Sequence, residues 1–154
     1  MSLEWMSEAP SPFSKVLVAN RGEIAVRVLQ AAKEAGLSCV AVFSGSDSSS
    51  LHVEMADEAV LLEGDTLEMT YLNGDSIIEA ARSTGADAIH PGYGFLSERA
   101  DFASAVEAAG IRWIGPSAHA IETMGDKISA RSLMIESGVP VIPGEQIPVE
   151  EGAD

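Results

Sequence analysis

The sequence predicts a doubly wound α/β fold, in which helices cover both faces of a parallel β-sheet. Short apolar runs rich in β-branched residues alternate with longer segments in which apolar residues recur at helical spacing. Glycines stand just after most of the helical segments, where they can end a helix. Strands that alternate with helices pair in parallel and are buried on both faces.

The first half of the chain is expected to supply three strands. Residues 15–19 (KVLVA) form the first β-rich run, and Ile24, Val28 and Ala31 then recur at helical spacing before Gly36. The expected elements are, in order, a strand over 15–19, a helix over 23–35, a strand over 38–43, a polar loop (SGSDSSS), a helical turn over 51–55 and a strand over 58–62.

The second half repeats strand and helix and then ends in helices. Asn73 or Asp75 can cap a helix that Gly85 ends, and Ser117 can cap a short helix after a glycine-proline turn. The expected elements are a helix up to residue 84, a strand over 86–89, a helix over 100–109 closed by Gly110, a strand over 111–114, a short helix, a helix over 126–137 ending at Gly138, and an extended segment over 139–143.

One folded domain is therefore expected over residues 15–143. Residues 1–14 read as a flexible tail with two prolines, and residues 144–154 as an acidic tail. A chain of 154 residues can bury a core, and 46% hydrophobic residues with a mean hydropathy of +0.14 exclude disorder.

Charge and cysteine content limit the partners and the compartment. The net charge of −15, from 24 acidic and 9 basic residues, argues against nucleic acid, whose phosphates would be repelled. High-salt adaptation, a basic partner or further sequence would each explain this acidity. No apolar stretch approaches the roughly 20 residues that span a bilayer, no signal peptide is visible, and the lone Cys39 is expected to be a buried thiol. These features predict a cytoplasmic protein without a membrane partner.

The stretch HPGYGFLSER, residues 90–99, is longer than a strand-to-helix turn needs. Such a connection typically takes two to six residues, whereas this one holds two glycines, a proline, a tyrosine and a glutamate. Glycine lets a backbone approach another group closely, and ligands of open parallel sheets sit beyond the carboxyl ends of the strands. The stretch is therefore predicted to be the floor of a ligand site.

Two nucleotide-binding motifs can be tested against the sequence. The P-loop pattern is absent. For a dinucleotide fingerprint Gly92 and Gly94 supply the first two glycines, but Ser97 stands in the third position and no acidic residue ends the next strand. A dinucleotide-dependent dehydrogenase is therefore disfavoured.

Three segments together resemble one family, the biotin carboxylase component of acetyl-CoA, propionyl-CoA and pyruvate carboxylases. They are ANRGEIAVR (residues 19–27), HPGYGFLSE (90–98) and WIGPSAHAIETMGDK (113–127). The resemblance runs from about residue 15 to residue 143. It implies the N-terminal, Rossmann-like domain of that enzyme, which precedes an ATP-grasp domain.

The resemblance also implies an activity. In the family, ATP activates bicarbonate to carboxyphosphate, and the carboxyl group then passes to the ureido nitrogen of biotin on a carrier protein. The complete enzyme would use ATP, Mg²⁺ and biotin, none of them bound tightly by this fragment. Its partners would be the ATP-grasp and C-terminal domains, a biotin carboxyl carrier protein, a carboxyltransferase component and a second copy in a homodimer. No catalytic residue is expected in this fragment, which should be inactive alone.

Particular residues inherit roles from the resemblance. Tyr93 and Gly94 would face biotin, and Lys127, which closes MGDK, would contact ATP. Glu98 would either form a wall of the site or cap the next helix. The expected dimer surface consists of Arg27, Gln30 and Glu34, although the family often has arginine where Gln30 stands.

Two features admit a structural interpretation. The turn Asn20-Arg21-Gly22 is explained equally well by a turn with a helix cap and by ligand contact. His52, His90 and His119 have no neighbours that suggest a metal, so no metal site is predicted.

A second hypothesis is a stand-alone binding or assembly module that docks to a separately encoded ATP-grasp partner. The sequence does not indicate which acyl-CoA or keto acid the parent carboxylase serves.

Overall fold

The fold is built on one parallel sheet of five strands. It is seen in a computed structural model that describes residues 12–125 and 127–142. The strand order is β3-β2-β1-β4-β5, the order of Rossmann-like sheets, and all four pairings are parallel. The strands are β1 (Lys15–Val18), β2 (Ser38–Phe43), β3 (Glu58–Leu61), β4 (Ala88–His90) and β5 (Arg112–Trp113). The predicted parallel sheet is confirmed.

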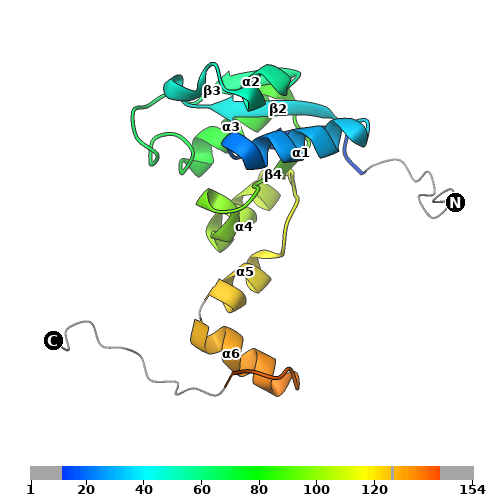
Figure 1. Cartoon of the computed structure of the whole chain (residues 1–154), viewed down its shortest axis with the longest axis vertical. Coiled ribbons are helices and arrows are strands. Elements are labelled where there is room, and N and C mark those ends of the chain that lie inside the picture. The colour runs from blue at the N-terminus through cyan, green and yellow to red at the C-terminus, as the bar shows by residue number, and fades with distance from the viewer. Residues whose placement is uncertain (1–11, 126, 143–154) are drawn as a thin grey trace, which may run out of the picture.

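Helices cover both faces of this sheet, as Figure 1 shows. Successive residues of β1 point to opposite faces: Val16 and Val18 belong to an apolar cluster with α1, whereas Leu17 joins the larger cluster with α3 and α4. The doubly wound fold is therefore confirmed. The helices are α1 (Gly22–Glu34), α2 (Leu51–Met55), α3 (Gly74–Thr84), α4 (Ala100–Ala108), α5 (Ala118–Gly125) and α6 (Lys127–Glu136), with short 3-10 helices η1 (Gly45–Asp47) and η2 (Phe95–Glu98).

The predicted end signals of α3 are formed as expected. Asn73 Oδ1 accepts a hydrogen bond from the Ser76 N–H at 3.0 Å, and Gly85 adopts the left-handed conformation with φ 67°. The Ala86 N–H still bonds to the Ala81 carbonyl, and this bond closes the helix. For that reason β4 begins at Ala88, two residues later than the sequence predicts.

The start of the described chain is tied to the sheet. Asp87 accepts hydrogen bonds from the Ser14 and Lys15 backbone N–H groups, each at 2.9 Å, and Phe13 packs against the α1 cluster. Ser14, predicted to end a flexible tail, is thus anchored. Residues 1–11 and the predicted acidic tail lie outside the described residues.

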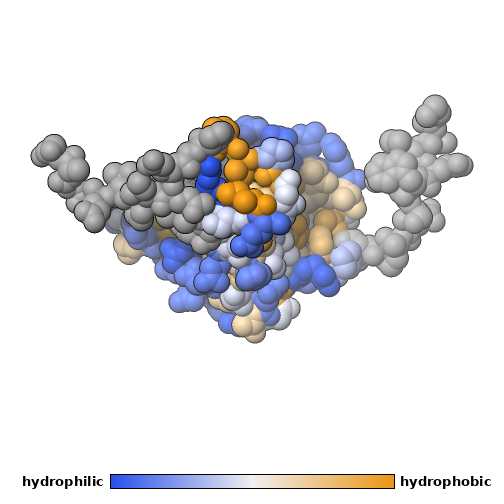
Figure 2. Space-filling model, turned by 90° about the horizontal axis from the view of Figure 1, so that it is seen from below, coloured by the Kyte–Doolittle hydropathy of each residue, from blue (hydrophilic) through white to orange (hydrophobic). Residues whose placement is uncertain are grey.

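The last two helices step away from the sheet along the long axis of the molecule (Figure 1). None of the side chains described in α6 is fully buried. Figure 2, viewed from the end where α6 lies, shows hydrophobic residues gathered among hydrophilic ones. The large exposed apolar residues in this part of the chain are Met124, Leu133, Ile135, Val139 and Ile142.

No helix among the described residues is long and apolar enough to cross a membrane.

Candidate functional site

The strand order places two turns side by side at the carboxyl edge of the sheet. The chain runs from β1 outward to β2 and β3 and then returns to β4 on the other side of β1. Val18 at the end of β1 therefore lies beside His90 at the end of β4. Ligands of doubly wound sheets bind at this reversal point. The turn after β1 (residues 19–21) and the turn after β4 (residues 91–95) meet there.

The turn after β4 is strongly bent, and its two glycines are needed for different reasons. Gly92 (φ 68°) has a left-handed backbone, and a Cβ atom added to it would lie 2.8 Å from Asn20 Nδ2. Gly94 (φ 66°, ψ −165°) adopts a conformation that is almost confined to glycine, but an added Cβ would meet nothing within 4 Å. A side chain at Gly92 would clash with Asn20, whereas the space that a side chain at Gly94 would occupy is empty.

Asn20 belongs to the turn after β1 and hydrogen-bonds to the turn after β4. Its side chain is 2% exposed, and its Nδ2 donates to the carbonyls of Pro91 at 2.7 Å and Tyr93 at 2.9 Å. The Arg21 N–H donates to Asn20 Oδ1 at 2.9 Å. The predicted strand-to-helix turn is formed, with Glu23 in the first turn of α1, but α1 has no side-chain cap at its N-cap residue, Arg21.

His90 supports the same turn from the end of β4. Its Nδ1 accepts a hydrogen bond from the Gly92 N–H at 3.0 Å, and burial lowers the pKa of its imidazole. The acceptor role requires an unprotonated Nδ1. This bond agrees with the structural role expected for His90.

A charged network lies beside Asn20. Arg21 forms a two-pronged ion pair with Asp47, at 2.7 Å through Nε and 2.6 Å through Nη2. Tyr71 Oη donates to Asp47 at 2.6 Å and accepts from the Ser44 N–H at 3.1 Å. Hydrogen bonding from Arg21 lowers the pKa of Asp47 to about 2, and burial raises the pKa of Tyr71.

The network reaches the turn after β4 through an aromatic stack. The rings of Tyr71 and Phe95 lie 5.5 Å apart at 18°. Phe95 is the one non-glycine residue with positive φ (47°) in the described part of the chain, a conformation that costs energy and must be held by its surroundings. The Tyr71 contact supplies part of that support.

Tyr93 points away from this buried network. Its side chain is 60% exposed, and its Oη donates to Glu23 Oε2 at 3.4 Å, over the first turn of α1. Beneath it lies an apolar groove of about 470 Å³ lined by Tyr93, His90, Ile24, Val28, Phe13 and Ile114 among others. The predicted biotin-facing pair thus combines an exposed aromatic ring with an uncovered glycine.

Glu98 and Arg99 lie on the other side of the same segment. Glu98 is exposed in η2, and α4 has no side-chain cap at its N-cap residue, Arg99. In the first turn Asp101 accepts from the Phe102 N–H at 2.9 Å. The structure therefore does not show the cap suggested for Glu98.

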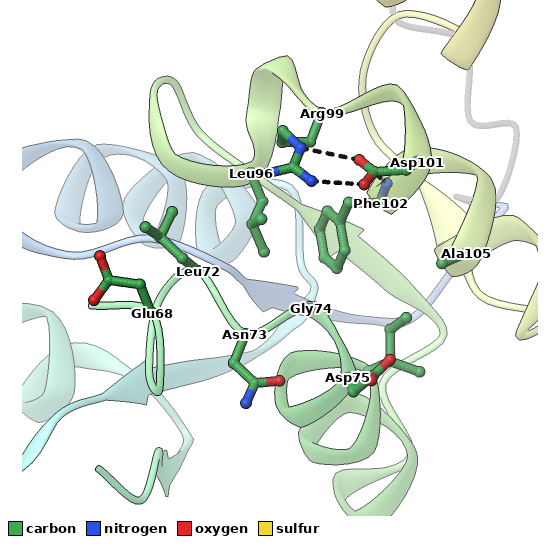
Figure 3. A pocket seen from close by; sticks show the side chains of 11 residues that line it. Glu68, Leu72, Asn73, Gly74, Asp75, Leu96, Arg99, Asp101, Phe102 and Ala105 are labelled. Atoms are coloured by element: carbon green, nitrogen blue, oxygen red, sulfur yellow. Dashed lines mark hydrogen bonds and ion pairs between the residues drawn. The ribbon is translucent and has the colours of Figure 1, made fainter. Parts of the chain in front are cut away.

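A second hollow of about 390 Å³ lies between the first turns of α3 and α4, shown in Figure 3. Arg99 and Asp101 form an exposed ion pair at 2.7 Å on its rim, and Phe102 packs against Gly74 inside. Arg99 and Asp101 neutralise each other. Glu68 and Asp75 also line the hollow and form no ion pair among the described residues, so the hollow is acidic and does not suit an anionic ligand.

The predicted dimer surface lies on the outer face of α1. Arg27, Gln30 and Glu34 are all exposed. Gln30 Nε2 donates to Glu34 Oε1 at 2.9 Å, and Arg27 Nε lies 3.8 Å from Glu23 Oε1. The three residues share one accessible face.

Lys127 begins α6, as the first residue of that helix. Its side chain lies outside the described part, so its distance from the β4 turn is not defined.

Cys39 is buried and free, and burial raises the pKa of its thiol. In the described ranges no group of three His, Cys, Asp or Glu side chains could hold a metal ion.

Comparison with known proteins identifies the family. The family model of the biotin carboxylase N-terminal domain matches residues 12–121. The chain belongs to this family.

Relatives of this biotin carboxylase N-terminal domain are much longer proteins. It is 52% identical over 144 residues to the biotin-dependent acyl-coenzyme A carboxylase alpha3 subunit of Mycobacterium leprae, covering 94% of this chain and 24% of that one. It is also 52% identical over 132 residues to biotin carboxylase 1 of Bacillus subtilis, covering 86% and 29%. The chain thus spans less than a third of either relative.

Solved structures share the fold. The biotin carboxylase domain dimer of Hydrogenobacter thermophilus 2-oxoglutarate carboxylase, in complex with MgADP, ADP and bicarbonate, matches with a TM-score of 0.84 and 47% identity, over 90% of this chain and 30% of that one. The urea amidolyase of K. lactis matches with a TM-score of 0.84 and 50% identity, over 88% and 8%.

Sequence reasoning named the turn of Asn20 in this biotin carboxylase N-terminal domain but missed the hydrogen bonds of Asn20 to the β4 turn, and it missed Asp47 and Tyr71 altogether. Asn20 carried a usable signal, because a polar residue directly after a buried strand lies at the ligand edge of a parallel sheet. Asp47 and Tyr71 carried none. Asp47 stands in a serine-rich loop that reads as solvated, and only the folded chain brings it to Arg21.

Proposed function

We propose that this chain is the first domain of an ATP-dependent biotin carboxylase, which carboxylates biotin on a carrier protein at the expense of ATP and bicarbonate. The observation that carries the proposal is the β4 turn, which Asn20 holds at the reversal point of the sheet, with the Tyr93 ring exposed and no atom within 4 Å of a Cβ added to Gly94. The family membership supports the reaction class.

The β4 turn would form one wall of the biotin site. The ureido ring of biotin is flat, with polar edges and apolar faces. The ring of Tyr93 offers an apolar plate with a polar tip, and Gly94 lets the ligand approach the backbone. Glu98 stays a candidate for the edge of that wall, since its side chain is exposed at the end of η2, which directly follows Gly94.

Lys127 would contact a phosphate of ATP. A lysine in the first turn of a helix opposes the positive end of the helix dipole, so it is favoured there when an anion lies nearby. Its ammonium group suits a phosphate as a compact point charge. We assign the Mg²⁺ ligands and the bicarbonate site to the ATP-grasp and C-terminal domains.

Exposed surfaces would join this domain to its partners. The face of α1 with Arg27, Gln30 and Glu34 would contribute to a homodimer of the complete enzyme. The apolar residues exposed on and after α6 support packing against further domains. The carrier protein and the carboxyltransferase component would be partners of the whole enzyme. The lone buried cysteine supports a reducing, cytoplasmic location.

The test is fixation of labelled bicarbonate into biotin. The full reading frame that contains this chain should form acid-labile carboxybiotin from free biotin only when ATP and Mg²⁺ are present. The 154-residue chain should give the same signal as a no-protein control, because it offers too few groups to neutralise a transferring phosphoryl group. Absence of carboxybiotin with the full-length protein would refute the proposal.

A further inference from the structure

We propose that Asn20 is the positioning residue of the biotin wall: it fixes the peptide planes of the β4 turn and thereby aims the Gly94 N–H at the ligand. The inference rests on the proposed function and adds a residue outside the turn itself. Asn20 is nearly fully buried and would not touch the ligand.

Each N–H of the Asn20 side-chain amide has its own acceptor in the β4 turn. A side-chain amide carries two N–H donors, and here both have acceptors, the carbonyls of Pro91 and Tyr93 at 2.7 and 2.9 Å. The Asn20 carbonyl oxygen accepts from the Arg21 N–H. One buried side chain thus binds two carbonyls, 71 and 73 residues away in sequence.

These bonds fix the direction of the neighbouring N–H groups. The described chain has no cis peptide bond, and in a trans peptide the C=O and N–H point in opposite directions. The Tyr93 carbonyl points at Asn20, so the N–H of Gly94 in the same peptide points away from it. That N–H donates no hydrogen bond within the described residues. A Cβ atom added to Gly94 would meet nothing within 4 Å, so the backbone at Gly94 is also uncovered on its side-chain side. The Gly94 N–H is a donor left for a ligand.

The Pro91–Gly92 peptide, two peptides before Tyr93–Gly94, is held at both ends. The Pro91 carbonyl bonds to Asn20, while the Gly92 N–H in the same peptide bonds to His90 Nδ1 at 3.0 Å. Rotation of either peptide plane would break a bond to a buried group. Preorganised backbone donors of this kind bind a polar ligand without the cost of ordering the loop at that moment.

Other side chains cannot replace Asn20. Aspartate has the same shape but no donors, so it would face two carbonyl oxygens with a negative charge. Serine offers one donor instead of two. Glutamine is one methylene longer than asparagine. The Asn20 amide already packs closely on Gly92, because a Cβ atom added to Gly92 would lie only 2.8 Å from Asn20 Nδ2, so a longer side chain has no room.

The test compares Asn20→Asp and Asn20→Ser in the full-length enzyme with Asn73→Ala. Asn73 caps α3 and does not bond to the β4 turn, so its loss lowers stability without moving the turn. For both Asn20 variants we expect the KM for free biotin to rise about tenfold or more, while the KM for ATP changes less than twofold. The Asn73 variant should leave both KM values within twofold of wild type. A biotin KM within twofold of wild type in Asn20→Asp, or equal rises in both KM values, would overturn the inference.

A measurement on the unmodified chain covers the case in which the Asn20 variants do not fold. Both Nδ2 hydrogens of Asn20 should exchange with solvent at least tenfold more slowly in NMR spectra than those of Asn73, for which the described residues offer no acceptor. Equal exchange rates would overturn the inference. Failure of the proposed function can be told apart from failure of this inference, because the wild-type full-length protein would then form no carboxybiotin at all.

Discussion

Arg21 and Asp47 form a two-pronged ion pair, at 2.6 and 2.7 Å, between the turn after β1 and the turn after β2. Asp47 also accepts a hydrogen bond from Tyr71, whose ring stacks on Phe95. Together, the ion pair, the Tyr71 hydrogen bond and the ring stack connect the turns after β1, β2 and β4 at the ligand edge of the sheet. The buried Asn20 makes a second connection between two of them.

Asp47→Asn should lower the free energy of unfolding by about 1 to 3 kcal/mol, the range for a lost hydrogen bond to a charged group. The Asp47 side chain is only 7% exposed, and its loss leaves Arg21 and Tyr71 without their carboxylate. Urea unfolding measures the change. The exposed Arg99–Asp101 pair is the matched control, and Asp101→Asn should give little change. Equal effects of the two substitutions would show that the Asp47 network contributes no more than a surface pair.

The same carboxylate predicts an acid dependence of stability. The folded pKa of Asp47 is about 2, below its ordinary value of 3.8, so the unfolded chain binds this proton more readily. The stabilisation is fully present above pH 4 and is lost as the pH falls from about 4 to 2, amounting to about 2 kcal/mol at 1.36 kcal/mol per pH unit. The difference in stability between wild type and Asp47→Asn should shrink over this window. A difference that stays constant from pH 6 to pH 2 would contradict the assignment.

If Lys127 has its proposed role, Lys127→Ala should weaken ATP binding to the full-length enzyme by about 1 to 3 kcal/mol, because a charged hydrogen bond to a phosphate would be lost. Lys33→Ala is the control, since Lys33 pairs with Asp57 at 3.0 Å on the protein surface. Calorimetric titration with ATP measures both variants. Unchanged affinity in Lys127→Ala would remove this residue from the ATP site.

The order of strands and helices could be predicted from the sequence because each depends on local patterns. Residues 38–43 and 51–55 form the predicted strand and helical turn with the predicted limits, and Asn73 caps α3 as expected. Element ends were less predictable: β5 is confined to Arg112–Trp113, although Ile114 still donates to the Ile89 carbonyl.

The buried polar contacts of the site could not be predicted, because they depend on which turns become neighbours. Asn20 meets Tyr93 only because β4 returns beside β1.

The conformation of Gly94 decides which residue is the better probe of biotin binding. Its φ of 66° with ψ of −165° makes any larger residue strained, so Gly94→Val would disturb the turn itself, and Tyr93 is the cleaner probe of biotin binding.

The most direct test of the biotin wall is the KM for free biotin in full-length Tyr93→Ala, measured beside Tyr93→Phe. Tyr93→Phe keeps the ring and loses only the 3.4 Å bond to Glu23, so its biotin KM should stay within about threefold of wild type. Loss of the exposed ring in Tyr93→Ala should raise the biotin KM about tenfold, equivalent to about 1.4 kcal/mol, with the KM for ATP unchanged. A wild-type biotin KM in Tyr93→Ala would contradict the assignment of this turn to the biotin site.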